Sequence, residues 1–399
     1  RSTEDRIRKA IRTLKSARKA LCAVRSLGKK GYEVYVACEK KFNISKFSKY
    51  ANGYIYLPSP SLEADKYINL LVEKLTEYDI DVIIPMEDDT VELLTKNIEL
   101  LKSTKTLIPD YETFTLARNK ALTIKAAIEN NISVPETYFI QSLKQLNNLA
   151  NDVNFPLIIK PRISSGSRGI VIVTNNNELI KKYKEIHKEY PYPIIQQYIE
   201  GDFEKVQVLA IFSQNNEVKG SCVYQGLREF PVDGGPVTLW KTISFPEIEE
   251  KTIAFLKNLK WKGFAEVEYI VNKKTNEYYL MEINPRFSAN IALAVQLGID
   301  FPVIFTELAL GKQIEYMRNN KYDEYCQWLL PGDLLNFIFN KNRFDQEIGY
   351  LFNKPNKIYY AILSKEDIKP VVATFLSLIL NIGSNMKDLI IKLRSGKSN

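Results

Sequence analysis

The stretch YYLMEINPRF (residues 278–287) is a short apolar strand that runs into a proline, yet it carries the polar residues Glu282 and Asn284. Side chains two residues apart on a strand point to the same face of the sheet, so these two lie together. A solvent-facing edge would explain such a pair as well as a binding site would. The neighbouring sequence is needed to decide between them.

A second strand, GFAEVEYIVN (263–272), precedes this stretch, and the connection KKTNE (273–277) suits a hairpin. If the turn centres on Thr275, Glu268 lies directly opposite Glu282. Two carboxylates opposed across an antiparallel pair destabilise it unless a positive charge lies between them. A merely polar outer face does not explain why the two acids coincide in register.

Glu268, Glu282 and Asn284 together offer two carboxylates and an amide. These are hard oxygen ligands, which suit magnesium rather than zinc. Glu266 shares the face of Glu268 and is a lower-ranked third acid. Arg286 follows on the chain, with a planar fork that matches phosphate or carboxylate. The hairpin therefore predicts a magnesium site with an arginine beside it.

An earlier stretch predicts an anion-binding loop. The strand FPLIIKP (155–161) contains Lys160, and the loop RISSGSRG (162–169) leads into the strand IVIV (170–173). Small residues let backbone N–H groups approach an anion closely, and hydroxyl groups and an arginine add donors. A flexible hairpin tip is the alternative. The loop is not a Walker A motif, because no Gly-Lys-Ser/Thr opens a helix here.

Composition is that of an ordinary globular protein, with 45% hydrophobic and 26% charged residues in 399, and the length suggests two or three domains. The net charge of +8 is modest, because 55 basic residues are offset by 47 acidic ones. Such a balance suits an anionic small ligand and does not argue for nucleic acid as a partner.

Cysteine and histidine chemistry is disfavoured. Cys22, Cys38, Cys222 and Cys326 have no metal-type spacing, and we expect reduced thiols in a cytoplasmic protein. The single histidine, His187, lies in a charged run and reads as a solvated residue. Carboxylates, amides, lysines and arginines must then carry any chemistry.

No apolar run is long enough to span a bilayer. The longest candidate, PVVATFLSLILNI (370–382), reads as a buried helix. The basic residues that follow it leave contact with a membrane surface open: Lys387, Lys392, Arg394 and Lys397.

The first hundred residues alternate between helix and strand patterns, which predicts a parallel sheet with helical crossovers. Helices are expected at 17–31, 67–79 and 90–103, and strands at 32–38 and 80–86. The strand expected before the first helix is missing, since RSTEDRIRKAIRTLKS reads as a basic helix. This end of the chain is therefore expected to be atypical or incomplete. No Gly-x-Gly-x-x-Gly fingerprint is present, which disfavours a dinucleotide site.

Beyond residue 110 a further helix is expected at 118–131, strands dominate from about 190 to 285, and a helix is expected near 247–260. The combination of VEYI…YYLMEINPRF, FPLIIKP with SSGSRG, and IIQQYIEG resembles the ATP-grasp superfamily over about residues 18–300. The resembling branch includes carbamoyl-phosphate synthetase large chains and biotin carboxylases.

The resemblance implies an N-terminal α/β pre-ATP-grasp domain with a parallel sheet at 1–110. A two-lobed α+β ATP-grasp domain would follow at 111–315, with a lid lobe at about 130–195, and a helical or mixed segment at 316–399. It also implies ATP and Mg²⁺ as cofactors, with two ions expected and Mn²⁺ as an alternative.

The resemblance assigns roles to matching positions. Glu268, Glu282 and Asn284 match the metal ligands, and Arg286 matches the arginine that steadies the transferred phosphoryl group or the acyl-phosphate. Two lysines and the loop 162–169 match the groups that bind the phosphates of ATP: Lys120, Lys160, Ser165, Gly166 and Ser167. The adenine is expected to bind along Gln196, Gln197, Tyr198 and Ile199, and the ribose at Glu204.

The implied reaction joins a carboxylate to an amine through an acyl-phosphate. Biotin carboxylases carry a His-Pro-Val-Thr-Glu run after the metal strand, and SANIALAVQLG (288–298) stands here instead, so the chain resembles a stand-alone ligase. Arg228, in LREFPVDGGPVTLWKT (227–242), is a candidate for the substrate carboxylate, although an ordinary hairpin connection fits equally well. Two further readings stay open: a ligase acting on bicarbonate, and a non-catalytic ATP sensor. The oligomeric state is also open, with a homodimer as one option.

Overall fold

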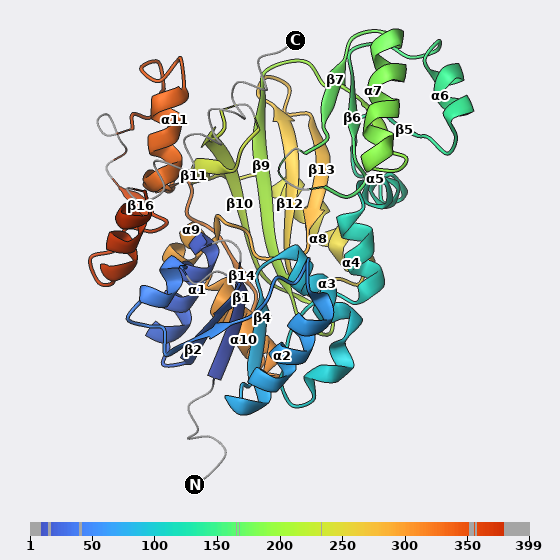
Figure 1. Cartoon of the computed structure of the whole chain (residues 1–399). Coiled ribbons are helices and arrows are strands. Elements are labelled where there is room, and N and C mark those ends of the chain that lie inside the picture. Colours follow the sequence, from blue (N-terminus) through green and yellow to red (C-terminus); the bar gives the residue numbers. More distant parts are fainter. Residues whose placement is uncertain are drawn as a thin grey trace.

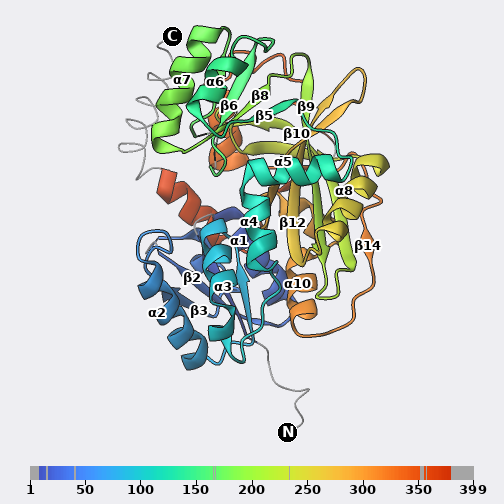
Figure 2. The same cartoon turned by 90° about the vertical axis from the view of Figure 1, so that its right-hand side faces the viewer.

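The computed structural model describes residues 9–14, 17–39, 42–164, 166, 168–232, 234–350, 355 and 357–378. Three sheets organise these residues: a parallel four-stranded sheet near the N-terminus, an eight-stranded central sheet, and a second four-stranded sheet. The N-terminal sheet and the second small sheet lie at opposite ends of the molecule, on either side of the central sheet (Figures 1 and 2).

The N-terminal sheet has the strand and helix alternation expected from the sequence. Its strands run parallel in the order β3-β2-β1-β4 and are β1 (Lys9–Leu14), β2 (Glu33–Cys38), β3 (Gly53–Tyr56) and β4 (Val82–Pro85). Helices α1 (Ala17–Lys29), α2 (Ala64–Glu77) and α3 (Asp88–Lys96) and the short turns η1 (Ile44–Phe47) and η2 (Ile98–Leu101) connect them. Helix α1 buries Ala20, Val24 and Leu27, which share one face at helical spacing.

The first strand of this sheet corrects the sequence interpretation. Residues 9–14, expected to be helical, form β1, which pairs with β2 on one side and β4 on the other. A strand flanked on both sides satisfies its backbone N–H and C=O groups in two ladders, and this tertiary context overrides a weak helix preference. Strand β3 also has no counterpart among the expected strands.

The helix expected at 118–131 is α5 (Lys120–Glu129), and a separate helix, α4 (Tyr111–Arg118), precedes it. Asn119 separates them with an extended backbone, and its side chain accepts a hydrogen bond from the N–H of Ala121 at 3.0 Å. Asparagine favours this helix-capping position. The break puts Lys120 at the first residue of α5.

The second small sheet has the order β5-β8-β6-β7 with antiparallel pairing, and comprises β5 (Thr137–Phe139), β6 (Leu157–Lys160), β7 (Val171–Val173) and β8 (Ile194–Gln197). Helices α6 (Leu143–Leu149) and α7 (Asn176–Glu189) contribute buried Leu146, Leu179 and Tyr183 to its core. This lobe therefore has an apolar core of its own, within the range expected for the lid.

The central sheet runs β13-β12-β9-β10-β11-β15-β16, with β14 beside β10. Its strands are β9 (Phe203–Phe212), β10 (Val218–Glu229), β11 (Val237–Thr242), β12 (Gly263–Asn272), β13 (Tyr278–Asn284), β14 (Met317–Arg318), β15 (Tyr325–Gln327) and β16 (Ile358–Tyr360). Helices α8 (Pro246–Asn258), α9 (Ile291–Leu297) and α10 (Phe301–Ala309) bury apolar side chains against it.

The register of the β12–β13 hairpin confirms the expected opposition of the acids. Glu268 pairs with Glu282, and Glu266 pairs with Asn284. The register then shifts by one residue, so that Tyr269 pairs with Leu280. This irregularity lies directly beside the acids, and such bulges occur preferentially near active sites, where they re-aim side chains.

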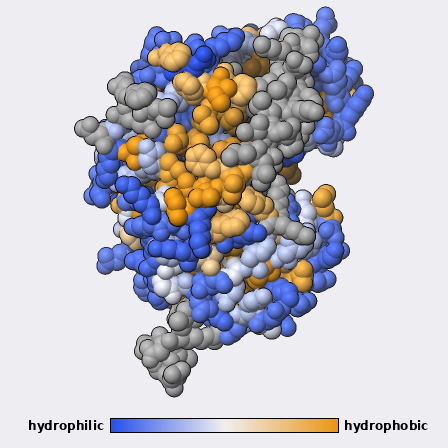
Figure 3. Space-filling view, turned by 60° about the vertical axis from the view of Figure 1, so that its left-hand side comes forward, coloured by the Kyte–Doolittle hydropathy of each residue, from blue (hydrophilic) through white to orange (hydrophobic). Residues whose placement is uncertain are grey.

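The segment after residue 315 adds β14, β15 and β16 to the central sheet and contains the turn η3 (Leu329–Asp333), helix α11 (Leu334–Phe339) and a helix at 369–378. Figure 3 shows apolar side chains gathered on the face that this segment lines. Among its described residues, Leu334, Ile338, Val372, Phe375 and Leu376 are exposed.

Among the described residues no single helix is long and apolar enough to cross a membrane. Helices α9 and α10 together have the length and apolar composition of a membrane span, but they are bent by 87° relative to each other. The basic residues expected to accompany a membrane contact, Lys387, Lys392, Arg394 and Lys397, lie outside the described residues.

Candidate functional site

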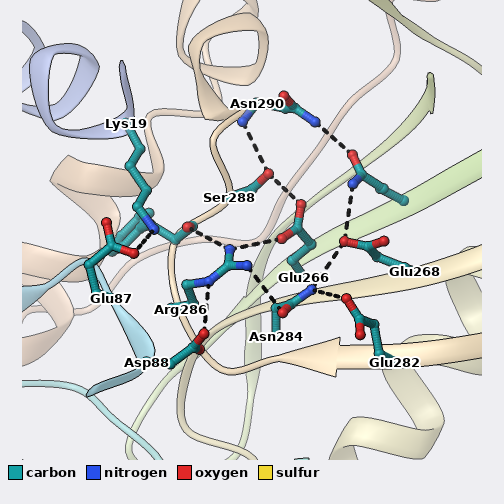
Figure 4. Close-up of polar contacts among 12 residues, drawn as sticks. Lys19, Glu87, Asp88, Glu266, Glu268, Glu282, Asn284, Arg286, Ser288 and Asn290 are labelled. Atoms are coloured by element: carbon teal, nitrogen blue, oxygen red, sulfur yellow. Dashed lines mark hydrogen bonds and ion pairs between the residues drawn. The ribbon is translucent and has the colours of Figure 1, made fainter. Parts of the chain in front are cut away.

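Strands β12 and β13 bring the predicted metal ligands together (Figure 4). The side-chain nitrogen of Asn284 donates to Oε1 of Glu268 at 3.1 Å and to Oε1 of Glu282 at 3.4 Å. An amide N–H₂ group thus lies between two carboxylates. The face that looked oddly polar in the sequence is one compact acidic site.

The two carboxylates differ in their electrostatics. Burial, and then the charges of Glu282 and Glu266, raise the pKa of Glu268. Burial acts to raise the pKa of Glu282 as well, but Lys120, whose Nζ lies 2.9 Å from Oε2, outweighs it, so that pKa is lowered. When both carboxylates are ionised, their negative charges repel each other in this buried site. A divalent cation bound between them would remove that repulsion.

The residues therefore fit a magnesium ion, with one adjustment. Oδ1 of Asn284 accepts a hydrogen bond from Nη2 of Arg286 at 3.2 Å, so the amide oxygen faces away from Glu268 and Glu282. Rotation of the amide would present that oxygen to a cation. Among the described residues no group of three or more His, Cys, Asp or Glu side chains has metal-binding geometry, so the amide is needed to complete the set.

Arg286 is held in a fixed position beside this site. Its Nη1 lies 3.1 Å from Oε2 of Glu266, and its Nε lies 3.5 Å from Oδ2 of Asp88. The hydroxyl of Ser288 donates to Oε1 of Glu266 at 2.5 Å. Burial acts to lower the pKa of Arg286, but Asp88 and Glu266 outweigh it and raise that pKa. Glu266 is engaged by Arg286 and Ser288, which favours a role in positioning the arginine.

Two lysines approach the acids from the other lobe and from α5. Nζ of Lys120 lies 2.9 Å from Glu282 and donates to the carbonyl of Ser164 at 3.4 Å. Nζ of Lys160 donates to Oε1 of Gln196 at 2.7 Å. Burial, and then the charge of Lys120, lower the pKa of Lys160 to about 8. Both side chains lie in the wall of one cavity, where an anion can reach them.

The predicted anion-binding loop lies beside these lysines. Ser164 is buried, and Gly166 is exposed with a φ of +65° and no atom within 4 Å of the place where a Cβ would lie. That backbone conformation favours glycine. Ser165 and Ser167 lie outside the described residues.

These groups share one cavity of about 490 Å³. Of the residues expected from the sequence, its walls include Lys120, Lys160, Ser164, Gly166, Glu268, Glu282 and Arg286. Asn284 is buried directly behind them. The structure therefore assembles the predicted phosphate and metal residues from elements that are more than a hundred residues apart in sequence.

Two predicted site residues line a neighbouring cavity. Arg228 and Glu204 lie in the walls of a cavity of about 720 Å³, which shares the wall residues Lys205 and Val237 with the 490 Å³ cavity. Nε of Arg228 lies 2.9 Å from Oδ1 of Asp333 and Nη2 lies 2.5 Å from Oδ2, a bidentate buried pair, and the guanidinium lies over the ring of Tyr350. Glu204 accepts a hydrogen bond from Gln225. Arg228 thus has a structural partner, and the geometry does not bring it to the acids.

The predicted adenine-binding residues lie at the end of β8 and just after it. The N–H of Gln197 donates to the carbonyl of Glu136 at 2.8 Å, and the N–H of Tyr198 donates to that of Pro156 at 3.2 Å. None of the four residues 196–199 lines the 490 Å³ cavity. Their contact with adenine stays a prediction.

Several residues of the site escaped the sequence analysis. Asp88 and Glu87 follow β4, and Glu87 pairs with Lys19 at 3.2 Å. Their position could have indicated a binding site from the sequence, because they follow the carboxyl end of a parallel strand, where open α/β sheets bind their ligands. Asn290 and Gln207, which are hydrogen-bonded to each other at 2.8 Å, carried no comparable signal.

The comparisons with known proteins agree with this geometry. The family model for the carbamoyl-phosphate synthase L chain, ATP binding domain, matches residues 117–317. The C-terminal section of the carbamoyl phosphate synthase large chain of Aquifex aeolicus is 28% identical over 216 residues, covering 51% of this chain and 39% of that protein. Acetyl-CoA carboxylase 1 of Arabidopsis thaliana is 25% identical over 192 residues, covering 46% and 8%. The chain thus spans well under half the length of these relatives.

Solved structures share the fold. The biotin carboxylase domain of the Hydrogenobacter thermophilus 2-oxoglutarate carboxylase, bound to MgADP and bicarbonate, has a TM-score of 0.65 at 17% identity, covering 80% of this chain and 74% of that one. An L-amino acid ligase from Bacillus licheniformis has a TM-score of 0.60 at 14% identity, covering 78% and 76%. N5-carboxyaminoimidazole synthetase from Staphylococcus aureus has a TM-score of 0.61 at 16% identity, covering 77% and 78%.

Contact with a membrane surface finds no support among these proteins. The match of the family model spans about half of the chain and includes the cavity residues Lys120, Lys160, Glu268, Glu282 and Arg286. With an ATP-grasp arrangement of sheets around those residues, the chain belongs to the family of the carbamoyl-phosphate synthase L chain ATP-binding domain, within the ATP-grasp superfamily.

Proposed function

We propose that this protein is an ATP-dependent ligase that activates a carboxylate as an acyl-phosphate for attack by an amine. The observation that supports this most is one cavity lined by Glu268 and Glu282 together with Lys120, Lys160 and Arg286. Two acids for a metal ion and three cations for phosphate oxygens suit phosphoryl transfer, because that reaction depends on positioning and charge neutralisation.

In the proposed reaction a carboxylate oxygen of the substrate attacks the γ-phosphorus of ATP, and the bond to the bridging oxygen breaks to release ADP. The amine then attacks the acyl carbon, loses a proton, and phosphate leaves. Lys120 and Lys160 would bind the phosphate oxygens, with the 162–169 loop over them. Arg286, held by Glu266 and Asp88, would bind the acyl-phosphate.

Glu268, Glu282 and the amide oxygen of Asn284 would hold Mg²⁺. A bound divalent ion would supply charge neutralisation at the phosphates. The MgADP complex of the Hydrogenobacter neighbour supports magnesium. We propose two ions, with Mn²⁺ as a substitute.

Adenine binding along residues 196–199 belongs to the same proposal and rests on the family resemblance. Ribose binding by Glu204 belongs to the proposal as well, because the cavity that Glu204 lines adjoins the one with the lysines. We assign no substrate contact to Arg228, because its guanidinium is paired with Asp333. The dimeric biotin carboxylase domain named above supports a homodimer. The four buried cysteines form no disulfide in the described part of the chain, which suits a reducing cytoplasm.

The test is the substitution Glu282→Gln. ADP release from Mg-ATP that depends on an added acid and an added amine should fall by at least about 100-fold, a loss on the scale of removing one preorganised charge-stabilising group. Glu277→Gln is the matched control, because Glu277 is an exposed glutamate on the same hairpin. It should leave ADP release unchanged.

The outcomes separate the competing functions. ADP release that survives Glu282→Gln would show that the metal assignment is wrong. Release driven by bicarbonate without another acid would favour the bicarbonate ligase. Nucleotide binding by the wild type with no ADP release from any pair of acid and amine would favour the ATP sensor.

A further inference from the structure

Besides the 720 Å³ cavity, a further cavity of about 520 Å³, named the second cavity from here on, adjoins the one that holds the acids and lysines. The two cavities share wall residues, and these include both Arg18 and Arg286. A molecule in the second cavity could therefore reach the proposed phosphoryl-transfer site without leaving the protein. Arg18 lies at the junction, near the start of α1.

The walls of the second cavity divide into an apolar side and a charged side. The apolar side is formed by Ile44, Trp328, Pro331, Ile362 and Leu378. On the charged side, Lys19 pairs with Glu87 at 3.2 Å. Asp88 lies 3.3 Å from Arg118 and 3.5 Å from Arg286. These charged groups already have partners of opposite sign.

Arg18 differs from them. Its side chain is 8% exposed, its Nη1 donates to the carbonyl of Val237 at 3.3 Å, and its guanidinium lies 3.7 Å from the centre of the Trp328 ring. Within the described part of the chain it forms no ion pair. Buried Arg228 pairs with Asp333, and half-buried Arg25, on the same helix as Arg18, pairs with Asp367.

A buried cation without a counter-ion is unfavourable, and burial lowers the pKa of Arg18 to about 9. Guanidinium groups bind carboxylates through two parallel N–H···O bonds, and Arg18 uses one nitrogen at a single carbonyl. The stack on Trp328 fixes the plane of the guanidinium and leaves its edge for a ligand.

We propose that the second cavity binds the acid substrate, a carboxylic acid with an apolar body, through an ion pair between its carboxylate and Arg18. The apolar body would lie against Trp328, Ile44 and Ile362. This inference rests on the proposed function, since it names the substrate class of the same site. An amine nucleophile fits the junction less well, because an ammonium group would face Arg18 and Arg286.

The first experiment measures ADP release with Mg-ATP and hydroxylamine, which traps an acyl-phosphate as a hydroxamate and releases phosphate. The assay compares singly charged acids of increasing apolar size: acetate, butanoate, hexanoate and 3-phenylpropanoate, with succinate as a polar control.

The KM of the acid should fall as its apolar body grows. Arg18→Met should raise the KM of the best acid by roughly 10- to 150-fold, the range expected for a lost charge-assisted hydrogen bond, with the KM of ATP unchanged.

Two further variants serve as controls. Arg18→Lys keeps the charge and loses the fork, so its KM should lie between those of wild type and Arg18→Met. Lys30→Met removes a positive charge directly after the same helix, at an exposed lysine that lines neither cavity, and it should behave as wild type. Thermal unfolding of each variant checks that it is folded.

Calorimetry of the acid with a non-hydrolysable ATP analogue separates this inference from the proposed function. Binding of apolar acids that is lost in Arg18→Met, without ADP release by the wild type, would support the acid site and contradict the ligase. ADP release whose acid KM is the same in Arg18→Met would support the ligase and overturn the acid site. If Arg18→Met weakened ATP binding and left acid binding unchanged, Arg18 would be a contact of the ATP phosphates, and the acid site would be overturned. The acid site would also be overturned if no acid bound to the wild type.

Discussion

At the scale of single residues, Lys160 shows how the site trades stability for binding. Its ammonium group is buried and donates a hydrogen bond to the amide oxygen of Gln196 at 2.7 Å. Burial, and then the charge of Lys120, lower its pKa from 10.5 to about 8. Its protonated form is therefore disfavoured in the folded protein. A phosphate in the cavity would restore the missing counter-charge, which is why we expect this residue to bind ATP.

We therefore predict that Lys160→Met stabilises the nucleotide-free protein by about 1–2 kcal/mol at pH 7 and weakens ATP binding. Because the folded-state pKa lies below the unfolded value, the wild type gains stability as pH rises from about 8 to 10.5, and the advantage of the variant disappears over that window. Urea unfolding between pH 7 and 10.5 measures this. A variant less stable than wild type at pH 7 would contradict it.

At the scale of elements, the β12–β13 hairpin opposes Glu268 and Glu282, a like-charge pair that weakens strand pairing. The amide of Asn284 donates a hydrogen bond to each of them. The hairpin register could be predicted from sequence because a short connection restricts it. The one-residue shift after Glu268 could not, because a bulge depends on packing against β9 as well.

We predict that Glu268→Gln raises the stability of the metal-free protein by about 0.5–1 kcal/mol, because it removes the repulsion across the hairpin. The raised pKa of Glu268 means that the wild-type repulsion is greatest when both groups are ionised, so the gain should shrink as pH falls. Adding Mg²⁺ should raise the melting temperature of the wild type and not that of the variant. A magnesium response retained by Glu268→Gln would refute the ligand assignment. Glu277→Gln again serves as the matched control.

At the scale of the whole molecule, a buried ion pair fastens the segment after residue 315 to the central sheet. Asp333 is fully buried, pairs with Arg228 of β10, and accepts a hydrogen bond from Thr238 of β11 at 2.9 Å and from Gln327 of β15 at 2.5 Å. The segment is therefore part of the body that supports the second cavity, to which Trp328 belongs.

We predict that Asp333→Ala destabilises the protein by about 3–5 kcal/mol, because the charge of Arg228 stays buried without a partner. The double variant Arg228→Met/Asp333→Leu should recover most of this loss and retain ATP binding. Denaturant unfolding of the single and double variants forms the required cycle. If the double variant folded but no longer bound ATP, Arg228 would have a role in the ATP site.

Local periodicity and short connections were enough to predict the alternation of the N-terminal sheet, the lid strands, the opposed acids and the loop beside Lys160. The folded chain alone shows that residues 9–14 form the strand between β2 and β4, that Arg228 pairs with Asp333, and that Arg18 and Arg286 both line two adjoining cavities. Each of these depends on contacts between residues far apart in the chain. The pattern of residues within one segment does not indicate which distant segment will pack against it.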